Sequence, residues 1–258
     1  MKLSLVSRIA FRYLRGKGSV NAVPILSRIS MIAIGVSSCA MIILFSVMNG
    51  FGDMINDLYK AFYPEIKIVA AEGKFFTPSV EHFEQLKKIK GIAHTALVIE
   101  DKVLVNTELG ETIPVNIKGV SADYFLVNDI KPHIVKGNST LLTQPLPTAI
   151  IGQHIASMLG IDVDNVFARM MLYYPNTDAQ AGNFAPTDAF QSLTLKPDGV
   201  FSVQDEFDSK YILAPLPEVQ VLMKQKNAIS SLEIKLVDDA SVADVQEKIK
   251  EQFGKKYR

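Results

Sequence analysis

The apolar positions of this chain are most concentrated in one uninterrupted stretch near its N-terminus. Residues 29–52 form 24 consecutive positions without a charge, between Arg28 and Asp53. About 20 apolar residues are needed for a helix to cross the hydrocarbon core of a bilayer, where a helix also satisfies its own backbone hydrogen bonds. The pattern therefore predicts one transmembrane helix, and no second stretch of this kind occurs in the sequence.

The helical period continues beyond the outer end of this stretch. Four apolar residues keep to one helix face: Met54, Ile55, Leu58 and Phe62. Pro64 disfavours helical backbone at the residue before it, so we expect the helix to end at Tyr63. Residues 25–63 are thus predicted to form a transmembrane helix and a stalk that projects from the membrane.

Residues 64–258 alternate between short strand-like and helix-like patterns. Alternating or continuous apolar runs predict strands over residues 65–70, 92–99, 102–107, 112–119, 149–152, 169–173, 191–201, 210–214 and 231–237. A period of 3.6 residues predicts helices over residues 79–90, 153–159, 216–224 and 241–253. This order predicts an α+β domain in which a strand-rich insertion lies between flanking βα units.

A long polar stretch, residues 174–189, interrupts this domain. Connections between neighbouring strands usually need about five residues, whereas this one is turn-rich and carries an isolated aromatic side chain. We expect it to protrude and to bind a partner through four residues: Tyr174, Pro175, Phe184 and Pro186. A solvated connection without a partner is the alternative interpretation.

The flanks of the apolar stretch predict its orientation. Every charged residue before it is basic: Lys2, Arg8, Arg12, Arg15, Lys17 and Arg28. Such an excess marks the cytoplasmic side of a span, so the N-terminus should be cytoplasmic and the main domain outside. Apolar residues within positions 1–17 recur opposite the arginines, which predicts that residues 1–24 form a basic amphipathic segment on the inner leaflet. An irregular basic flank is the alternative.

Composition narrows the possible functions further. The chain has 27 basic and 27 acidic residues; without the six basic residues before the span, 21 basic and 27 acidic residues remain, a net charge of −6. This balance gives no reason to expect nucleic-acid binding. Cys39 is the single cysteine, so no disulfide can form within the chain. Residues 36–39 look like a lipoprotein signal, but the long basic region before them and the apolar sequence after them favour a retained anchor.

The sequence carries no strong pattern for catalysis or metal binding. It contains no GxxxxGK[ST] phosphate loop and no GxSxG motif. Four histidines lack metal-ligand spacing: His82, His94, His133 and His154. Two clusters of acidic residues are expected in solvated turns: Asp162 with Asp164, and Asp205 with Glu206 and Asp208. We therefore predict no catalytic residue, no metal ligand and no cofactor.

Several motifs together resemble one known family. RYLR stands at residues 12–15, IGV at 34–36, SVMNGF at 46–51 and IIG at 150–152. This combination resembles the lipoprotein-releasing ABC transporter permeases of the LolC/LolE type, over residues 1–253. The resemblance implies a MacB-like periplasmic core domain over residues 64–258, with a βα-type and a β-rich subdomain.

The resemblance also implies a function. The chain would be the N-terminal part of a membrane subunit in the bacterial inner (cytoplasmic) membrane, which extracts lipid-modified proteins and passes them to a periplasmic lipoprotein carrier. A separate cytoplasmic ABC ATPase would supply the energy, and a second permease copy or a paralogue would pair with the subunit. The acyl chains are expected to contact five helix residues: Met48, Phe51, Met54, Ile55 and Leu58. Packing of these residues against other spans is the alternative.

Two departures from the family pattern leave other interpretations open. Such permeases continue with three more spans, whereas this sequence ends at Arg258, so we expect it to be a piece of a longer protein. The family's Gly-Asp turn is replaced by residues 162–165. The alternatives are a MacB-like exporter, an FtsX-like regulator of cell-wall hydrolysis, and a single-pass anchored binding module.

Overall fold

The fold is that of a computed structural model of the 258-residue chain. The structure describes residues 22–79, 88–106, 112–176 and 189–253, together with Leu5, Ile9, Leu86 and Tyr257; for residues 22–24 and 56–58 it describes the backbone alone. The chain divides into two compact units, Met1–Asn56 and Asp57–Arg258. Most of the predicted amphipathic segment, residues 1–24, lies outside the described residues.

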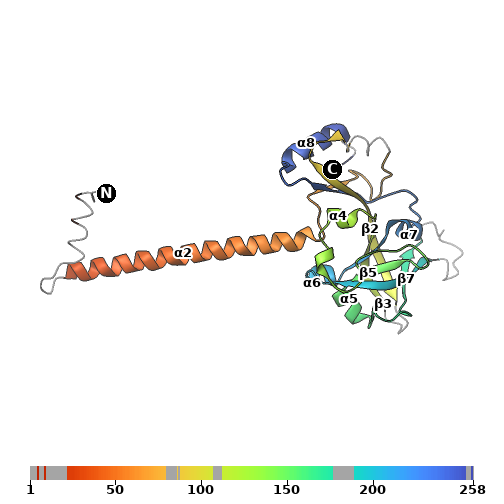
Figure 1. The fold of residues 1–258 in the computed structure, drawn as a ribbon, viewed down its shortest axis with the longest axis horizontal. Coiled ribbons are helices and arrows are strands. Elements are labelled where there is room, and N and C mark those ends of the chain that lie inside the picture. Colours follow the sequence, from red (N-terminus) through yellow and green to blue (C-terminus); the bar gives the residue numbers. More distant parts are fainter. Residues whose placement is uncertain are drawn as a thin grey trace. The chain divides into compact units, whose positions relative to one another are not determined.

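One long helix, α2 (Ala22–Lys60), contains the predicted span (Figure 1). Within α2, Ile25–Ile55 has a mean hydropathy of 2.3 and is long and apolar enough to cross a membrane. At 1.5 Å per residue these 31 residues extend about 46 Å, more than the roughly 30 Å of a hydrocarbon core. No other described helix meets this length and composition.

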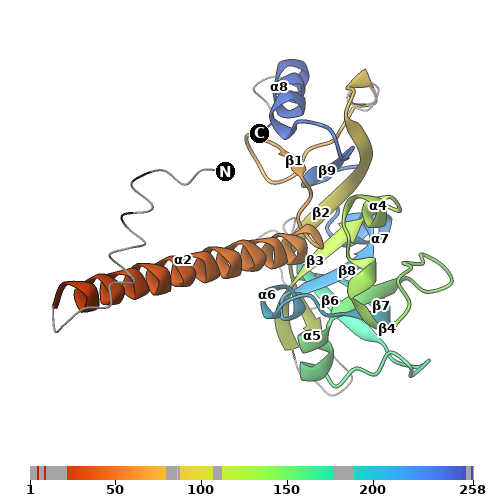
Figure 2. The ribbon, with the colours of Figure 1, turned by 60° about the vertical axis from the view of Figure 1, so that its left-hand side comes forward.

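The second unit is built on a nine-stranded mixed sheet (Figure 2). Its strands are β1 (Ile66–Val69), β2 (Ile92–Asn106), β3 (Thr112–Val120), β4 (Ile134–Gly137), β5 (Thr148–Gly152), β6 (Met170–Pro175), β7 (Phe190–Phe201), β8 (Tyr211–Pro215) and β9 (Ser231–Leu236). They are hydrogen-bonded in the order β1-β9-β2-β3-β8-β5-β7-β4, and β6 pairs with β2 and β7. The β3–β8 and β5–β7 pairs are parallel and the other pairs antiparallel.

Short helices connect and cover these strands. They are α4 (Tyr124–Val127), the 3₁₀ helix η1 (Lys131–His133), α5 (Gln153–Met158), α6 (Asp205–Asp208), α7 (Leu216–Leu222) and α8 (Val242–Phe253). The large hydrophobic cluster includes side chains of α7, α8 and the sheet, and a second cluster gathers around Phe62, Tyr124 and Phe207. Close packing of α7 on β3 requires a glycine there, because a Cβ atom at Gly119 would lie 2.6 Å from the Cβ atom of Val219.

Most predicted elements are present, with shifted limits. The strands predicted over 92–99 and 102–107 are one strand, β2, because the charged pair between them stays in the ladder and finds polar partners. The helix predicted to end at Tyr63 ends at Lys60. The predicted loop over 174–189 is shorter, because Tyr174 and Pro175 belong to β6 and pair with β7. The one-turn helices α4 and α6 and the strand β4 were not predicted.

Two predicted features fall largely outside the description. Of the helix predicted over residues 79–90, Leu86 and Lys88 are described as helical and residues 80–85 are not described. The predicted turn between β2 and β3 lies in residues 107–111, also outside the description. The two strands that it joins do form an antiparallel pair, with Asn106 opposite Thr112.

Candidate functional site

The five residues predicted to contact acyl chains lie on the outer part of α2. At 3.6 residues per turn their positions fall within about a third of the helix circumference. Within the first unit, Met48, Phe51 and Met54 are 60%, 54% and 52% exposed, and Ile55 is partly exposed. The side chain of Leu58 lies outside the described part of the chain. The described members of this face are thus apolar and available to lipid or to other helices.

The chain that follows α2 enters the core of the second unit. Phe62 is 2% exposed, and its ring stacks on Phe207 with centroids 4.6 Å apart and an angle of 8° between the planes. The rings of Phe201 and Tyr211 lie 5.1 and 5.3 Å from that of Phe62. Tyr63 also reaches Phe207, with its centroid at 5.7 Å. The last turn of the helix is therefore anchored in the domain by aromatic packing.

A buried ion pair lies beside this aromatic cluster. Lys118 of β3 and Glu233 of β9 are 2.9 Å apart, and their side chains are 4% and 0% exposed. The Lys118 ammonium also donates to the carbonyl oxygen of Phe62 at 3.3 Å and to the hydroxyl of Tyr124 at 3.2 Å. Asn128 donates from its side-chain amide to Glu233 at 2.7 Å. One buried cation thus joins the segment after α2 to β3, β9 and α4.

Burial and charge act in opposite directions on Lys118. Removal from water alone would lower the pKa of its ammonium, but the carboxylate of Glu233 outweighs that effect and raises the pKa above its ordinary value. Burial raises the pKa of the Tyr124 hydroxyl, so it stays protonated. Because both charges are shielded from solvent, loss of either would leave the other unpaired in the core.

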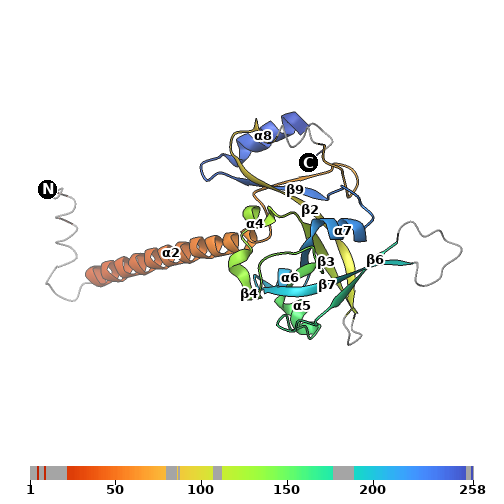
Figure 3. The ribbon, with the colours of Figure 1, turned by 45° about the vertical axis from the view of Figure 1, so that its right-hand side comes forward.

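The predicted partner-binding loop is carried by the β6–β7 hairpin (Figure 3). The ladder pairs Tyr174 with Gln191 and Pro175 with Phe190, and the Asn176 amide then donates to the carbonyl oxygen of Ala189 at 2.9 Å. Phe184 and Pro186, the other two predicted contact residues, lie in residues 177–188, outside the described residues. The hairpin therefore holds Asn176 and Ala189, the residues on either side of the segment 177–188, next to each other.

Side chains hold the base of the hairpin to the rest of the domain. The Tyr174 hydroxyl donates to Asp101 at 2.8 Å, and the Lys224 ammonium donates to the side-chain oxygen of Asn176 at 2.9 Å. Burial, together with the hydrogen bond to Asp101, raises the pKa of Tyr174 to about 12. Tyr174 was predicted as a partner contact; the structure places its hydroxyl in the support of the hairpin.

The opposite face of the hairpin is apolar and exposed. Met171 and Phe190 are 40% and 42% exposed, and Pro175 is exposed beside them. The ring of Tyr173 meets that of Phe190 edge to face, with centroids 6.4 Å apart. These four side chains form an apolar strip that leads to the segment 177–188.

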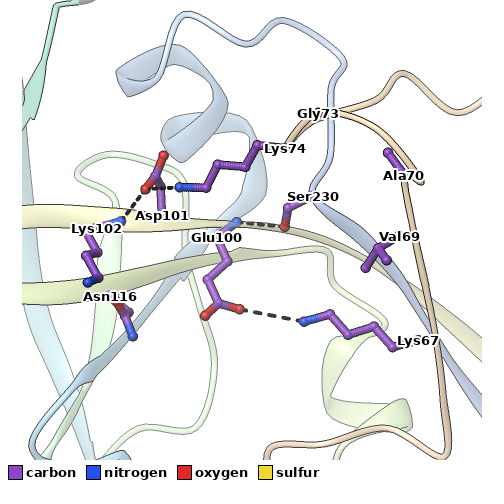
Figure 4. Close-up of a pocket in the computed structure, with 10 residues that line it drawn as sticks. All are labelled: Lys67, Val69, Ala70, Gly73, Lys74, Glu100, Asp101, Lys102, Asn116 and Ser230. Atoms are coloured by element: carbon purple, nitrogen blue, oxygen red, sulfur yellow. Dashed lines mark hydrogen bonds and ion pairs between the residues drawn. The ribbon is translucent and has the colours of Figure 1, made fainter. Parts of the chain in front are cut away.

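A shallow polar cavity of about 490 Å³ is lined by residues of β1, β2 and β3 and of the segments after β1 and before β9 (Figure 4). Three lysines, at positions 67, 74 and 102, and the carboxylates of Glu100 and Asp101 line it. Lys74 binds Asp101, and Glu100 accepts from the Tyr211 hydroxyl at 3.1 Å. Both carboxylates are thus engaged in holding β2 to its neighbours, which gives them a structural role.

The carboxylates expected in solvated turns have different environments in the structure. Lys136 lies 2.6 Å from Asp162 and 2.9 Å from Asp164, in exposed pairs, as expected for solvated turns. Asp208 was expected in solvent, and this is wrong: it is 5% exposed and accepts from the Ser202 hydroxyl at 3.0 Å and the Val203 amide at 2.9 Å. It holds the turn between β7 and α6. The described residues include no group of three His, Cys, Asp or Glu that could hold a metal ion.

The buried network was not predicted from the sequence. The available signal was position: Lys118 stands between Ile117 and Gly119, and Glu233 between Leu232 and Ile234. One basic and one acidic residue, each directly flanked by uncharged residues within a strand, fit the pattern of a buried pair. It could not be assigned without knowing that β3 and β9 both flank β2.

Comparison of the sequence with known proteins identifies the family to which the chain is related. The profile of the MacB-like periplasmic core domain matches residues 27–252. The chain is 26% identical over 253 residues to the lipoprotein-releasing system transmembrane protein LolE of Haemophilus influenzae, covering 92% of this chain and 56% of that protein. It is 25% identical over 228 residues to LolC of Buchnera aphidicola, covering 87% and 51%. The chain thus spans about half the length of these curated relatives.

Solved structures agree at the level of the fold. The periplasmic region of MacB from Actinobacillus actinomycetemcomitans superposes with a TM-score of 0.53 at 12% identity, covering 74% of this chain and 86% of that one. The extracellular domain of the ABC-type transporter YknZ from Gram-positive bacteria gives a TM-score of 0.51 at 11% identity, covering 75% and 97%.

Proposed function

The chain belongs to the family of the MacB-like periplasmic core domain, and from this premise we propose that it is the N-terminal part of a lipoprotein-releasing ABC permease. In this proposal the subunit extracts lipid-modified proteins from the bacterial inner membrane and passes them to a periplasmic carrier. The observation that carries the proposal is the match to LolE, which covers 92% of the chain and includes the membrane helix.

In this proposal, each segment of the chain has its own location and role in the transporter. The basic N-terminus is cytoplasmic, α2 spans the membrane, and the domain after it is periplasmic, organised as residues 1–24, 25–63 and 64–258. Within the domain, a βα-type and a β-rich subdomain share the continuous sheet. ATP is hydrolysed by a separate cytoplasmic ABC ATPase, so this subunit is not itself an enzyme, and a second permease copy or a paralogue completes the transporter. Nucleic acid has no part in it.

The exposed face of α2 is the proposed contact for acyl chains. Met48, Phe51 and Met54 are apolar, and unbranched methionine adapts to irregular apolar partners. Ile55 and Leu58 extend the same face toward the domain. Lipid-modified protein would enter the permease along this face.

The β6–β7 hairpin is the proposed contact for the periplasmic carrier. Its base is held by Tyr174 and Asn176, and its outer face carries the exposed apolar strip of Met171, Pro175 and Phe190. A supported hairpin with an unpaired apolar face suits docking of another protein, because little order has to be gained on binding. Phe184 and Pro186 would extend the contact beyond the described residues.

A cellular test uses the full-length permease. Residues 177–188 are replaced by a short Gly-Ser turn, which leaves the contacts of Tyr174 and Asn176 in place. We expect an unchanged melting temperature, loss of cross-linking to the carrier, and accumulation of lipoproteins in the inner membrane. The matched control replaces the exposed Val221 of α7 by Ser and should behave as the original protein. If sorting and cross-linking survive the replacement, the carrier docks elsewhere.

The main alternative is a MacB-like exporter, because the MacB periplasmic region shares the fold. An FtsX-like regulator and an anchored binding module are less well supported, since the relatives that match over most of the chain are lipoprotein-releasing proteins. Cells in which the gene is depleted distinguish these cases. Retained lipoproteins indicate the proposed function, whereas loss of drug export or of septal hydrolysis with normal lipoprotein sorting would contradict it.

A further inference from the structure

The second unit contains an apolar cavity that the proposed function does not use. Its volume is about 570 Å³, and it lies between α4, the segment 139–143 after β4, and the start of α7. Its apolar lining comes from Val120, Phe125, Leu126, Leu141 and Leu216. Cavities that hold small molecules in proteins commonly measure about 300–1,000 Å³. The size and lining are therefore those of a ligand site.

Among the described residues that line this cavity, Lys131 is the one that carries a charge. Its ammonium lies 5.8 Å from the centroid of the Phe125 ring, a cation–π distance, and among the described residues it pairs with no carboxylate. The hydroxyl-bearing residues Ser139, Thr140 and Thr143 line the same cavity. An unpaired cation and several hydroxyls beside an apolar interior favour a ligand with an anionic head and an apolar body.

The walls argue against an extended peptide as the ligand. Pro215 and Pro217 stand at the start of α7 and have no N–H to donate to a peptide carbonyl. A peptide bound here would therefore have backbone N–H and C=O groups without hydrogen-bond partners, whereas an acyl chain has no such groups. The same chain also contains a helix long and apolar enough to cross a membrane, and membrane lipids are a source of acyl chains.

We propose that this cavity binds a single-chain anionic lipid of the fatty-acid class. The acyl chain lies against Phe125, Leu126 and Leu216, and the carboxylate pairs with the Lys131 ammonium beside the hydroxyls of the mouth. The proposal rests on the cavity alone and does not depend on lipoprotein release. The acyl groups of a lipid-modified cysteine carry no anionic head, so the ligand is distinct from the proposed cargo.

Photo-labelling of the whole chain in lipid nanodiscs tests the site. The probe is a sixteen-carbon fatty acid with a diazirine near the chain end, and labelled peptides are identified by mass spectrometry; the probe length is chosen to suit a drug-sized cavity of about this volume. We expect labelling in the peptides that contain residues 120–143 or 215–217. Labelling confined to α2 would overturn the proposal, because it would report partition into the bilayer.

Three variants sharpen the result. Leu126→Glu places a carboxylate at the cavity and should abolish labelling there, and Lys131→Gln should lower it about tenfold by removing one charge-assisted contact. Val221→Glu is the matched control: Val221 is 73% exposed on α7 and does not line the cavity, so labelling should be unchanged. Equal labelling in Lys131→Gln and the original chain would refute the role of the cation.

Competition identifies the ligand class. An excess of the unlabelled fatty acid should displace the probe, whereas its neutral methyl ester and a diacyl phospholipid should not. Displacement by the methyl ester as strongly as by the acid would contradict an anionic ligand. Displacement by an acidic apolar peptide but not by the fatty acid would replace the lipid with a polypeptide partner and would also overturn the proposal.

Discussion

Replacing Lys118 by methionine should strongly destabilise the second unit. Methionine has a similar length but no charge, so Glu233 would keep its carboxylate in the core with Asn128 as its remaining donor. Breaking a buried pair on one side typically costs about 3–5 kcal/mol, and here both side chains are at most 4% exposed. For a domain of this size 1 kcal/mol corresponds to about 2–4 °C, so the melting temperature should fall by about 6–20 °C.

A second substitution distinguishes an unpaired charge from simple loss of packing. In the double variant Lys118→Met/Glu233→Gln no charge is left unpaired, and the new amide offers an N–H to the side-chain oxygen of Asn128, which has no partner among the described residues. We expect at least half of the lost stability to return. The carbonyl of Phe62 and the hydroxyl of Tyr124 still lose their donor, at about 1 kcal/mol each, so recovery should be incomplete.

The assay is thermal unfolding of the chain in detergent, followed by near-ultraviolet circular dichroism. Lys136→Met, which removes an exposed partner of Asp162 and Asp164, is the matched control and should melt like the original chain. An unchanged melting temperature for Lys118→Met would refute the reasoning. So would a double variant that is no more stable than Lys118→Met, because the coupling between the two sites would then be absent.

The pH dependence follows from the same pair. The pKa of Lys118 is higher in the folded state than in the unfolded state, where it is about 10.4. The stability that the Lys118 ammonium contributes is therefore fully present below about pH 10.4, and it is lost only as the pH rises through the higher pKa of the folded state. The destabilisation by Lys118→Met should therefore persist at about pH 9, because the Lys118 ammonium of the original chain is still protonated there. A penalty that disappears by about pH 9 would contradict a lysine held protonated.

Three further predictions concern the hairpin, the packing and the topology. Tyr174→Phe removes the hydrogen bond to Asp101 and should lower the free energy of unfolding by about 1 kcal/mol in denaturant titration, whereas Tyr173→Phe should have a smaller effect; equal effects would contradict the support role. Gly152→Ala would place a Cβ atom 2.1 Å from the carbonyl oxygen of Asp208 and should cost about 1–3 kcal/mol, whereas Gly50→Ala, which meets nothing within 4 Å, should leave the unfolding temperature unaltered. In a Cys39→Ser background, a membrane-impermeant maleimide should label Val221→Cys in spheroplasts and leave Ser19→Cys unlabelled; the opposite pattern would reverse the orientation.

The sequence predicts much of this architecture because its patterns are local. The uncharged stretch over residues 29–52 and the apolar runs of β5, β7 and β9 depend on neighbouring residues alone, and they predict α2 and most strands. The α+β class and the MacB-like domain follow from these elements and from the family motifs, and the profile match confirms that domain.

The features that required the structure depend on long-range pairing. Glu100 and Asp101 read as a break between two strands, yet they continue β2 because Tyr211 and Tyr174, more than 70 positions away, supply donors. Asp208 looked solvated because its donors, Ser202 and Val203, are brought to it by the turn before α6. Likewise, Phe62 was predicted on the stalk, whereas it packs into the aromatic cluster of the second unit.

Release of a lipoprotein from proteoliposomes tests the central claim most directly. The full-length permease is reconstituted with its ATPase and a fluorescent triacylated lipoprotein, and purified periplasmic carrier and ATP are added outside. We predict that the lipoprotein appears in soluble complex with the carrier and that this requires ATP. When residues 177–188 of the permease are replaced, the ATPase of the assembled transporter should still hydrolyse ATP, but no lipoprotein should be released. If ATP is hydrolysed by the complete system while the lipoprotein stays in the membrane, the chain does not belong to a lipoprotein-releasing permease.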